Sequence, residues 1–227
     1  MKIAEMFYSI QGEGLLAGVP SAFVRTSGCN LRCSWCDTPY ASWKPEGSDV
    51  GIEQILAFVQ SQGCGHTVLT GGEPMIHRGI VDLTHRLKAN AQHITIETAG
   101  TVFEPVACDL MSVSPKLANS TPWKADASGW AARHESLRYQ PEVLAALVSR
   151  YPYQLKFVVS DPADLEEIET IVGRLRAQPD RVLLMPEGRD AAHLAERSRW
   201  LAEVCKQTKY RFCPRLHILL WGDRRGV

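Results

Sequence analysis

Hydrophobic and polar residues follow two alternating patterns along the chain, one of short apolar runs and one with helical spacing. The short runs are rich in Val, Ile, Leu and Thr, which is typical of buried strands, and they cover residues 21–28, 66–72, 93–100, 109–116, 153–160 and 181–188. The helical pattern covers residues 49–65, 76–91, 140–152, 161–178 and 189–208. Strands and helices that alternate in this way predict a parallel sheet with right-handed crossovers.

Two local signals refine this pattern. Asp161 followed by Pro162 predicts a helix N-cap with proline at the first helical position. The last apolar run, residues 210–221, predicts one more strand. No internal repeat or long linker divides the sequence, so we expect a single domain over residues 1–227.

The predicted strands end in polar or glycine-rich sequence, at residues 28–29, 70–74, 97–100, 112–116 and 185–187. In a barrel the carboxyl ends of all strands converge on one mouth, whereas a doubly wound sheet gathers functional groups at one switch point. Six or seven strands are too few for a complete eight-stranded barrel. We therefore predict an α/β fold, a partial TIM-type barrel of about six parallel strands with helices outside.

The charge balance argues against polyanionic partners. Lys plus Arg (25) equal Asp plus Glu (25), so no net positive field favours nucleic acid or anionic membranes. No apolar run reaches the roughly 20 residues that cross a bilayer, and residues 1–14 lack the pattern of a signal peptide. We expect a cytoplasmic protein with no nucleic-acid or membrane partner.

Three of the seven cysteines, Cys29, Cys33 and Cys36, lie within the stretch "SGCNLRCSWCDTPY". Disulfides are rare in a reducing compartment, so metal binding is the better interpretation. A structural zinc needs four ligands, and the remaining cysteines are scattered singly, as small buried hydrophobic residues often are: Cys64, Cys108, Cys205 and Cys213. An iron-sulfur cubane also takes four ligands, but three thiolates leave one iron open for a substrate or cosubstrate.

The spacing "CNLRCSWC" at residues 29–36 resembles the signature of the radical S-adenosylmethionine enzymes, and "TGGEP" at residues 70–74 resembles their second motif. The resemblance implies a radical SAM core in which Cys29, Cys33 and Cys36 hold a [4Fe-4S] cluster. It also implies that S-adenosylmethionine chelates the open iron and yields a 5'-deoxyadenosyl radical, which abstracts a hydrogen atom.

The same resemblance implies contacts to S-adenosylmethionine. Gly71 and Gly72 leave backbone carbonyls open to the methionine ammonium, while Glu73 fixes the bend. Trp35 is expected to contact adenine or to anchor the loop in the core, and Glu97 to accept from ribose or to stay solvated. The implied cofactor-binding set is Trp35, Cys36, Asp37, Gly71, Gly72, Glu73, Glu97, Ser114, Pro115, Lys116, Leu184, Met185, Pro186 and Glu187.

Residues 5–40, "EMFYSIQGEGLLAGVPSAFVRTSGCNLRCSWCDTPY", resemble the opening of the 7-carboxy-7-deazaguanine synthases. The similarity continues through "IETAG", "SVSPK", "LLMPEG" and "RLHILLWGDRRG". It implies a lyase that rearranges 6-carboxy-5,6,7,8-tetrahydropterin into 7-carboxy-7-deazaguanine with loss of ammonia, in the queuosine (7-deazapurine) pathway.

This narrower resemblance also implies a substrate site. Gln11 and Glu13 would accept from the donor edge of the pterin, and the guanidinium of Arg25 would bind its carboxylate. The implied substrate-binding set is Ile10, Gln11, Gly12, Glu13, Arg25, Thr70 and His217. His217, alone in an apolar run, is expected either in the core or near substrate; the chain continues past it, so Val227 is assigned no role.

A magnesium ion is the third implied cofactor, with Thr38 as its protein ligand and Asp37 supporting it. The family further implies a flavodoxin or ferredoxin as electron donor and a homodimer. Two other interpretations stay open at this point. One is an activase of glycyl-radical enzymes, which needs a protein partner, and the other is a non-catalytic module that holds zinc or an inert cluster.

Overall fold

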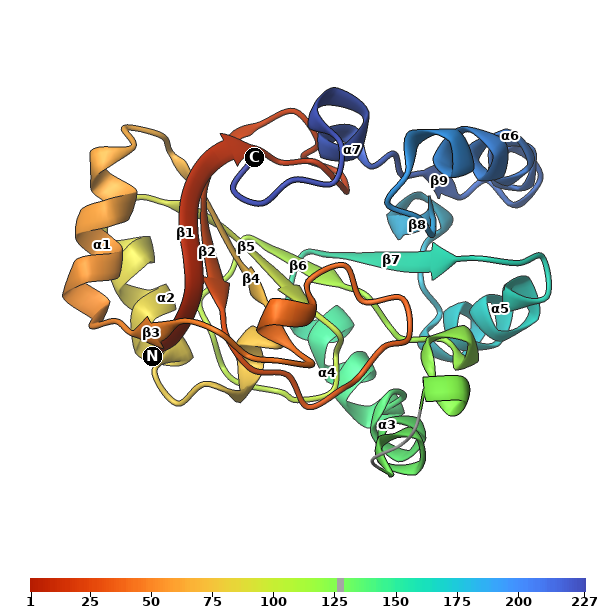
Figure 1. Cartoon of the computed structure of the whole chain (residues 1–227), viewed down its shortest axis with the longest axis horizontal. Helices are drawn as coiled ribbons and strands as arrows, with labels where there is room; N and C mark the ends of the chain where they lie inside the picture. Colours follow the sequence, from red (N-terminus) through yellow and green to blue (C-terminus); the bar gives the residue numbers. More distant parts are fainter. Residues whose placement is uncertain (126–128) are drawn as a thin grey trace.

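The computed structural model describes residues 1–125 and 129–227, which form a curved sheet with helices outside it (Figure 1). The strands are β1 (Lys2–Ile10), β2 (Pro20–Thr26), β3 (Ser48–Asp49), β4 (His66–Gly71), β5 (His93–Thr98), β6 (Leu110–Val113), β7 (Tyr153–Val159), β8 (Val182–Pro186) and β9 (Arg211–Phe212). Their spatial order is β3-β1-β2-β4-β5-β6-β7-β8-β9.

Seven of these nine described strands run parallel and pair in the order in which they occur in the chain, from β2 to β9. β1 pairs antiparallel with both β2 and β3. The sheet is open, with β3 at one edge and β9 at the other. The predicted partial barrel is therefore confirmed, and the strand β1 is an addition that the sequence pattern did not predict.

The α-helices are α1 (Ile52–Ser61), α2 (Ile80–Ala89), α3 (Trp130–Leu137), α4 (Pro141–Arg150), α5 (Asp164–Leu175), α6 (Ala191–Thr208) and α7 (Leu216–Trp221). Short 3-10 turns are η1 (Pro39–Ala41), η2 (Pro74–Ile76), η3 (Ala118–Ser120), η4 (Trp123–Ala125) and η5 (Pro179–Arg181). As Figure 1 shows, helices connect the parallel strands except β5 and β6, which a loop joins, and α2, α4, α5 and α6 pack against the sheet. None of the described helices is long and apolar enough to cross a membrane.

The core lies between the sheet and these helices because each element buries one apolar face. Leu69, Ile96 and Phe157 on the strands are fully buried, as are Leu83 and Leu147 on the helices, all within one cluster. Burying a side chain of this size contributes about 1.5–3 kcal/mol. The scattered cysteines behave as expected at two positions, where Cys205 and Cys213 are buried, while Cys64 and Cys108 are half-buried.

Two local predictions were wrong. Helix α5 begins at Asp164, not next to Asp161. Pro162 lies instead in a turn before the helix, in which the carboxylate of Asp161 accepts from the N–H of Ala163 at 2.9 Å. The run 210–221 is not one strand: β9 stops after two residues and α7 follows. Pro214 explains the break, since it has no N–H to continue a strand ladder.

A buried histidine near the amino ends of the strands should make folding pH-dependent. His66 lies between the hydroxyls of Ser21 (2.6 Å) and Thr95 (2.9 Å), and burial lowers its pKa from 6.5 to about 4. The unfolded chain therefore binds this proton at a higher pH than the folded chain, so stability falls as the pH drops through this window. Between about pH 7 and pH 4.5, we expect wild-type protein to lose roughly 1–3 kcal/mol more stability than His66→Gln in urea unfolding.

The matched control for this experiment is His85→Gln, at an exposed position on α2, which should keep the wild-type pH dependence. Equal pH dependence of stability in the His66→Gln and wild-type proteins would contradict the lowered pKa of His66 in the folded chain.

Candidate active site

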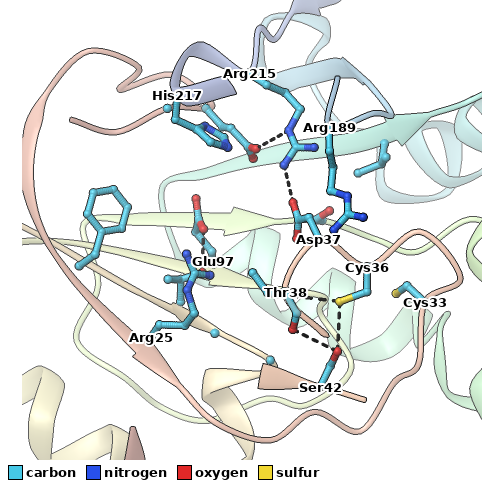
Figure 2. A pocket seen from close by; sticks show the side chains of 18 of the residues that line it. Arg25, Cys33, Cys36, Asp37, Thr38, Ser42, Glu97, Arg189, Arg215 and His217 are labelled. Carbon is cyan, nitrogen blue, oxygen red and sulfur yellow. Dashed lines mark hydrogen bonds and ion pairs between the residues drawn. The ribbon is translucent and has the colours of Figure 1, made fainter. Parts of the chain in front are cut away.

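A cavity of about 400 Å³ opens at the carboxyl ends of the parallel strands. Its wall is built from the ends of β2, β4, β5, β6, β7 and β8, the loop after β1, and α7 with the residues that follow it. Figure 2 shows side chains from these distant segments facing one another across this space. The volume is in the range of small-molecule sites in proteins.

The three clustered cysteines lie on the loop between β2 and η1, and all three line the cavity. The base of this loop is closed by a hydrogen bond from the N–H of Gly28 to the carbonyl of Ala41 at 2.8 Å. Its outer side is held by Asn119, which accepts from the Trp35 indole at 3.1 Å, and by His134, which accepts from the N–H of Arg32 at 3.0 Å. Helix α3 and turn η3 therefore fix the loop from outside the cavity.

The chemistry of these thiols fits a soft metal cluster. Burial raises the pKa of Cys29 to about 12, reinforced by the carboxylate of Glu73 and by Cys36, and burial with the two neighbouring thiols also raises the pKa of Cys33. Cys36 contacts the hydroxyl of Ser42 at 3.1 Å. In residues 1–125 and 129–227 no three His, Cys, Asp or Glu side chains form a ready-made metal site. Cys29, Cys33 and Cys36 would hold such a cluster as thiolates, so their protons would be released when it binds.

Gly72, directly after β4, allows this loop to lie against the sheet. A Cβ atom built there would stand 2.1 Å from the carbonyl oxygen of Gly28 and 2.5 Å from that of Ala41. The next residue, Glu73, donates its N–H to the same Gly28 carbonyl at 2.9 Å. Any side chain at position 72 therefore displaces the base of the cysteine loop.

The carboxylate of Glu73 faces away from the cavity and is fully buried. It accepts from the N–H groups of Met75 (3.1 Å) and Ala99 (2.8 Å) and from the hydroxyl of Thr98 (2.8 Å). These bonds tie the end of β4 to the end of β5. Glu73 thus supports the wall from behind.

Glu97 lies among residues predicted for substrate rather than among those predicted for S-adenosylmethionine. Its two oxygens accept from the side-chain amide of Gln11 at 3.3 Å and the hydroxyl of Thr70 at 2.8 Å. The ammonium of Lys156 lies 3.7 Å from it. The result is a polar wall that joins the loop after β1 to strands β4, β5 and β7.

Glu13 sits between two buried cations. One oxygen pairs with Lys156 and the other lies 3.1 Å from Nε of Arg215. Burial alone would raise the pKa of Glu13, but the two cations outweigh it and hold the pKa well below its usual range. The carboxylate is therefore ionised, and it is an acceptor for any donor that enters the cavity.

Arg25 also faces the cavity (Figure 2). Its Nε donates to Glu5 at 2.7 Å, and that carboxylate in turn accepts from the Tyr40 hydroxyl at 2.8 Å. In the described part of the chain its two terminal nitrogens have no protein partner. They remain available to bind an anion.

Of the residues predicted from the sequence, most line the cavity, including all seven of the substrate set and all three cysteines. Five lie behind its wall: Glu73, Pro115, Leu184, Pro186 and Glu187. Leu184 belongs to the core, and Glu187 pairs with Arg197 on α6. His217 lines the cavity from α7, where its ring fills the space that a Cβ on Gly12 would need.

Sequence reasoning missed several residues of the site. Lys156 and Arg215 are each only 5–6% exposed, and both face the cavity. Lys156 carried a signal, because it is the lone charged residue in the apolar run 153–160. Residues 223–227 also line the cavity, including Val227, to which no role was assigned.

Proteins of known family are similar to this chain in sequence and in fold. A family model for the radical SAM superfamily matches residues 23–116. The 7-carboxy-7-deazaguanine synthase of Halobacterium salinarum is 48% identical over 98% of this chain and 91% of its own length, and that of Rhodopirellula baltica is 47% identical over 99% and 88%. The crystal structure of QueE from Escherichia coli superposes with a TM-score of 0.70 at 28% identity, covering 95% of this chain and 94% of that chain.

Identity close to one half along nearly the whole of both chains, with matching folds, shows common membership. The chain therefore belongs to the 7-carboxy-7-deazaguanine synthase family of radical S-adenosylmethionine enzymes.

Proposed function

We propose that this chain forms 7-carboxy-7-deazaguanine, the compound in its relatives' name, from 6-carboxy-5,6,7,8-tetrahydropterin with loss of ammonia. The observation that carries this proposal is one cavity of about 400 Å³ with the three cysteines on one wall and an array of carboxylates and guanidinium groups on the other. A bounded cavity of this size suits a small flat molecule better than a segment of a partner protein.

Cys29, Cys33 and Cys36 would ligate three irons of the family's [4Fe-4S] cluster. When bound, the cluster and S-adenosylmethionine supply the 5'-deoxyadenosyl radical that removes a hydrogen atom from the substrate. The backbone at Gly71 and Gly72 lies open to the cavity, where it would receive the methionine end of S-adenosylmethionine.

Other residues of the implied S-adenosylmethionine set fall into two groups. Trp35, Ser114, Lys116 and Met185 line the cavity and would contact the cofactor directly. Lys116 donates to Ser114 at 2.7 Å and lies 5.7 Å from the centre of the Trp35 ring. The five residues behind the wall would act only by holding the lining in place.

The substrate would lie against the opposite wall. Ionised Glu13 accepts from the pterin amide and amine, and the free nitrogens of Arg25 bind its carboxylate. Gln11 and Thr70, fixed by Glu97, orient the ring edge. His217 would close this wall from α7.

Thr38 would bind the magnesium ion. Its hydroxyl lies on the cavity side of the cysteine loop, 3.8 Å from the sulfur of Cys36 (Figure 2). The neighbouring Asp37 is held by its pair with Arg215 and would support the magnesium site next to the Thr38 hydroxyl. Magnesium commonly keeps several waters and takes its other ligands from substrate. A flavodoxin or ferredoxin as electron donor, a homodimer and a cytoplasmic location complete the proposal.

Product formation tests the proposal directly. Reconstituted, reduced wild-type protein should convert the pterin to the deazaguanine when supplied with S-adenosylmethionine and magnesium. Thr38→Ala should lower the rate at limiting magnesium by roughly tenfold or more, because removal of a metal ligand costs about that factor or more in affinity. Excess magnesium should recover part of this loss.

The control is Thr170→Ala, at an exposed position on α5. Cleavage of S-adenosylmethionine without deazaguanine in the wild-type protein would reject the proposed reaction. An unchanged magnesium dependence in Thr38→Ala would reject the role of Thr38 alone.

A further inference from the structure

Arg215 joins three segments that meet at the cavity. It stands at the start of α7 and is 6% exposed. Its Nε lies 3.1 Å from Glu13, one terminal nitrogen donates to the carbonyl of Gly188 at 2.5 Å, and the other pairs with Asp37. Figure 2 shows the bond between the labelled Arg215 and Asp37.

Each partner belongs to a different part of the proposed reaction site. Glu13 lies in the loop after β1 that is proposed to bind substrate. Asp37 stands directly between Cys36 and Thr38, and Gly188 follows the end of β8. The N–H of Leu216 adds a backbone bond to the carbonyl of Gly12 at 2.8 Å.

These segments are otherwise anchored separately. The loop after β1 is held to β7, where Gln154 accepts from the N–H of Leu15 at 2.7 Å. The cysteine loop is held by η3 and α3, as described above. A planar guanidinium with donors on several edges can bond two carboxylates and a carbonyl at once, which a lysine ammonium on a single stem does with less fixed geometry.

We propose that Arg215 is a positioning residue, which holds the substrate loop around Glu13 in register with the loop that carries Cys36 and Thr38. This role rests on the proposed function. Arg215 acts through Glu13 and Asp37. Without it, both carboxylates lose a cation and both loops lose their common anchor, and a displacement near 1 Å is enough to impair a reaction by about 100-fold.

The test compares Arg215→Gln and Arg215→Lys with the wild type in the full-length, reconstituted protein. Product and 5'-deoxyadenosine are measured separately, together with iron content per chain. We expect Arg215→Gln to keep its iron and to cleave S-adenosylmethionine within roughly threefold of the wild type, while product per cleavage falls by at least about 30-fold. Arg215→Lys should recover part of this ratio because it restores the charge.

Binding provides a readout that does not depend on turnover. The probe is 6-carboxypterin, a fluorescent oxidised analogue of the substrate, titrated with protein by fluorescence anisotropy; its Kd for Arg215→Gln should rise by about tenfold with magnesium present. The control is Arg174→Gln, which replaces an exposed arginine that lies 3.6 Å from Glu142. It should leave every quantity at the wild-type value.

Three outcomes overturn the positioning role. They are an unchanged product ratio in Arg215→Gln, a parallel loss of iron, cleavage and product, and a Kd equal to that of the wild type. If Arg215→Gln does not fold, the double-mutant cycle of Glu13→Gln and Asp37→Asn decides. If Glu13 and Asp37 act through one guanidinium, the double variant should lose about tenfold less of the deazaguanine-to-deoxyadenosine ratio than the two single losses multiplied together. Losses that simply multiply would reject the coupling.

The wild-type reaction separates this proposal from the proposed function. Absence of the deazaguanine from wild-type protein rejects the reaction itself. An active wild type with an unaltered Arg215→Gln rejects only the role of Arg215.

Discussion

Replacing Gly72 with alanine is expected to lower the rate of product formation by at least about 100-fold, because the base of the cysteine loop must move. The new methyl group would stand 2.1 Å and 2.5 Å from two carbonyl oxygens of the backbone, those of Gly28 and Ala41. Neither can turn aside as a flexible side chain can. The shift would break the bond from Glu73 to Gly28 and displace Cys29, which follows Gly28 directly.

The measurement is product formation together with iron content per chain after reconstitution, since a displaced Cys29 should also weaken retention of the cluster. Gly173→Ala is the matched control. No atom of the surroundings lies within 4 Å of a Cβ built at Gly173, which is on α5, so alanine there should keep full activity and add about 0.5–1 kcal/mol of stability. Gly72→Ala protein with normal iron and activity would contradict the close packing described here.

Lys156→Met is expected to destabilise the cluster-free protein by about 3–5 kcal/mol, because it removes one of the two cations beside buried Glu13 and the ammonium near Glu97. Lys156 is 5% exposed, pairs with Glu13 and lies 3.7 Å from Glu97. For a chain of this size, such a loss lowers the melting temperature by roughly 6–20 °C. Activity should fall as well, since Glu13 would no longer be held in place.

Urea unfolding of the cluster-free chain gives the free energy directly. Adding Glu13→Gln to Lys156→Met should recover part of the lost stability, because one buried negative charge is removed. Lys206→Met, which breaks an exposed pair with Glu203 at 2.7 Å, should change stability by less than about 1 kcal/mol. Similar losses for the Lys156→Met and Lys206→Met variants would show that burial of the first pair has no energetic consequence.

The sequence predicts the parts of this molecule that are encoded locally. The six short runs of Val, Ile and Leu between residues 21 and 188 each form a strand, the motif at residues 29–36 follows β2, and the motif at residues 70–74 begins in the last residues of β4. Short-range patterns reveal these strands because a parallel strand is buried on both faces and is therefore apolar along its whole length. They reveal the motifs because ligand-binding residues in such folds follow the carboxyl ends of the strands. The spacing of the three cysteines can be recognised without knowing which distant residues surround them in the fold.

The remainder depends on residues that meet only in the folded chain. Nothing near position 156 shows that its lysine reaches Glu13, and nothing near position 215 shows that its arginine reaches Asp37. Residues 216–221 are all apolar except His217, so their pattern does not distinguish a strand from the helix that forms. Likewise, Glu73 and Glu187 follow strands as site residues do, yet their carboxylates point to partners outside the cavity.

The stepwise order of the parallel strands has a consequence for how the protein matures on the ribosome. Apart from β3, which joins β1 at the other edge, each new strand from β2 to β9 joins the edge left by the one before it, so the sheet can grow as the chain emerges. The cavity cannot, because Glu13 is made early but its partners follow 143 and 202 residues later. A nascent chain therefore carries the cysteine loop well before Arg215, which completes this part of the cavity, has been translated.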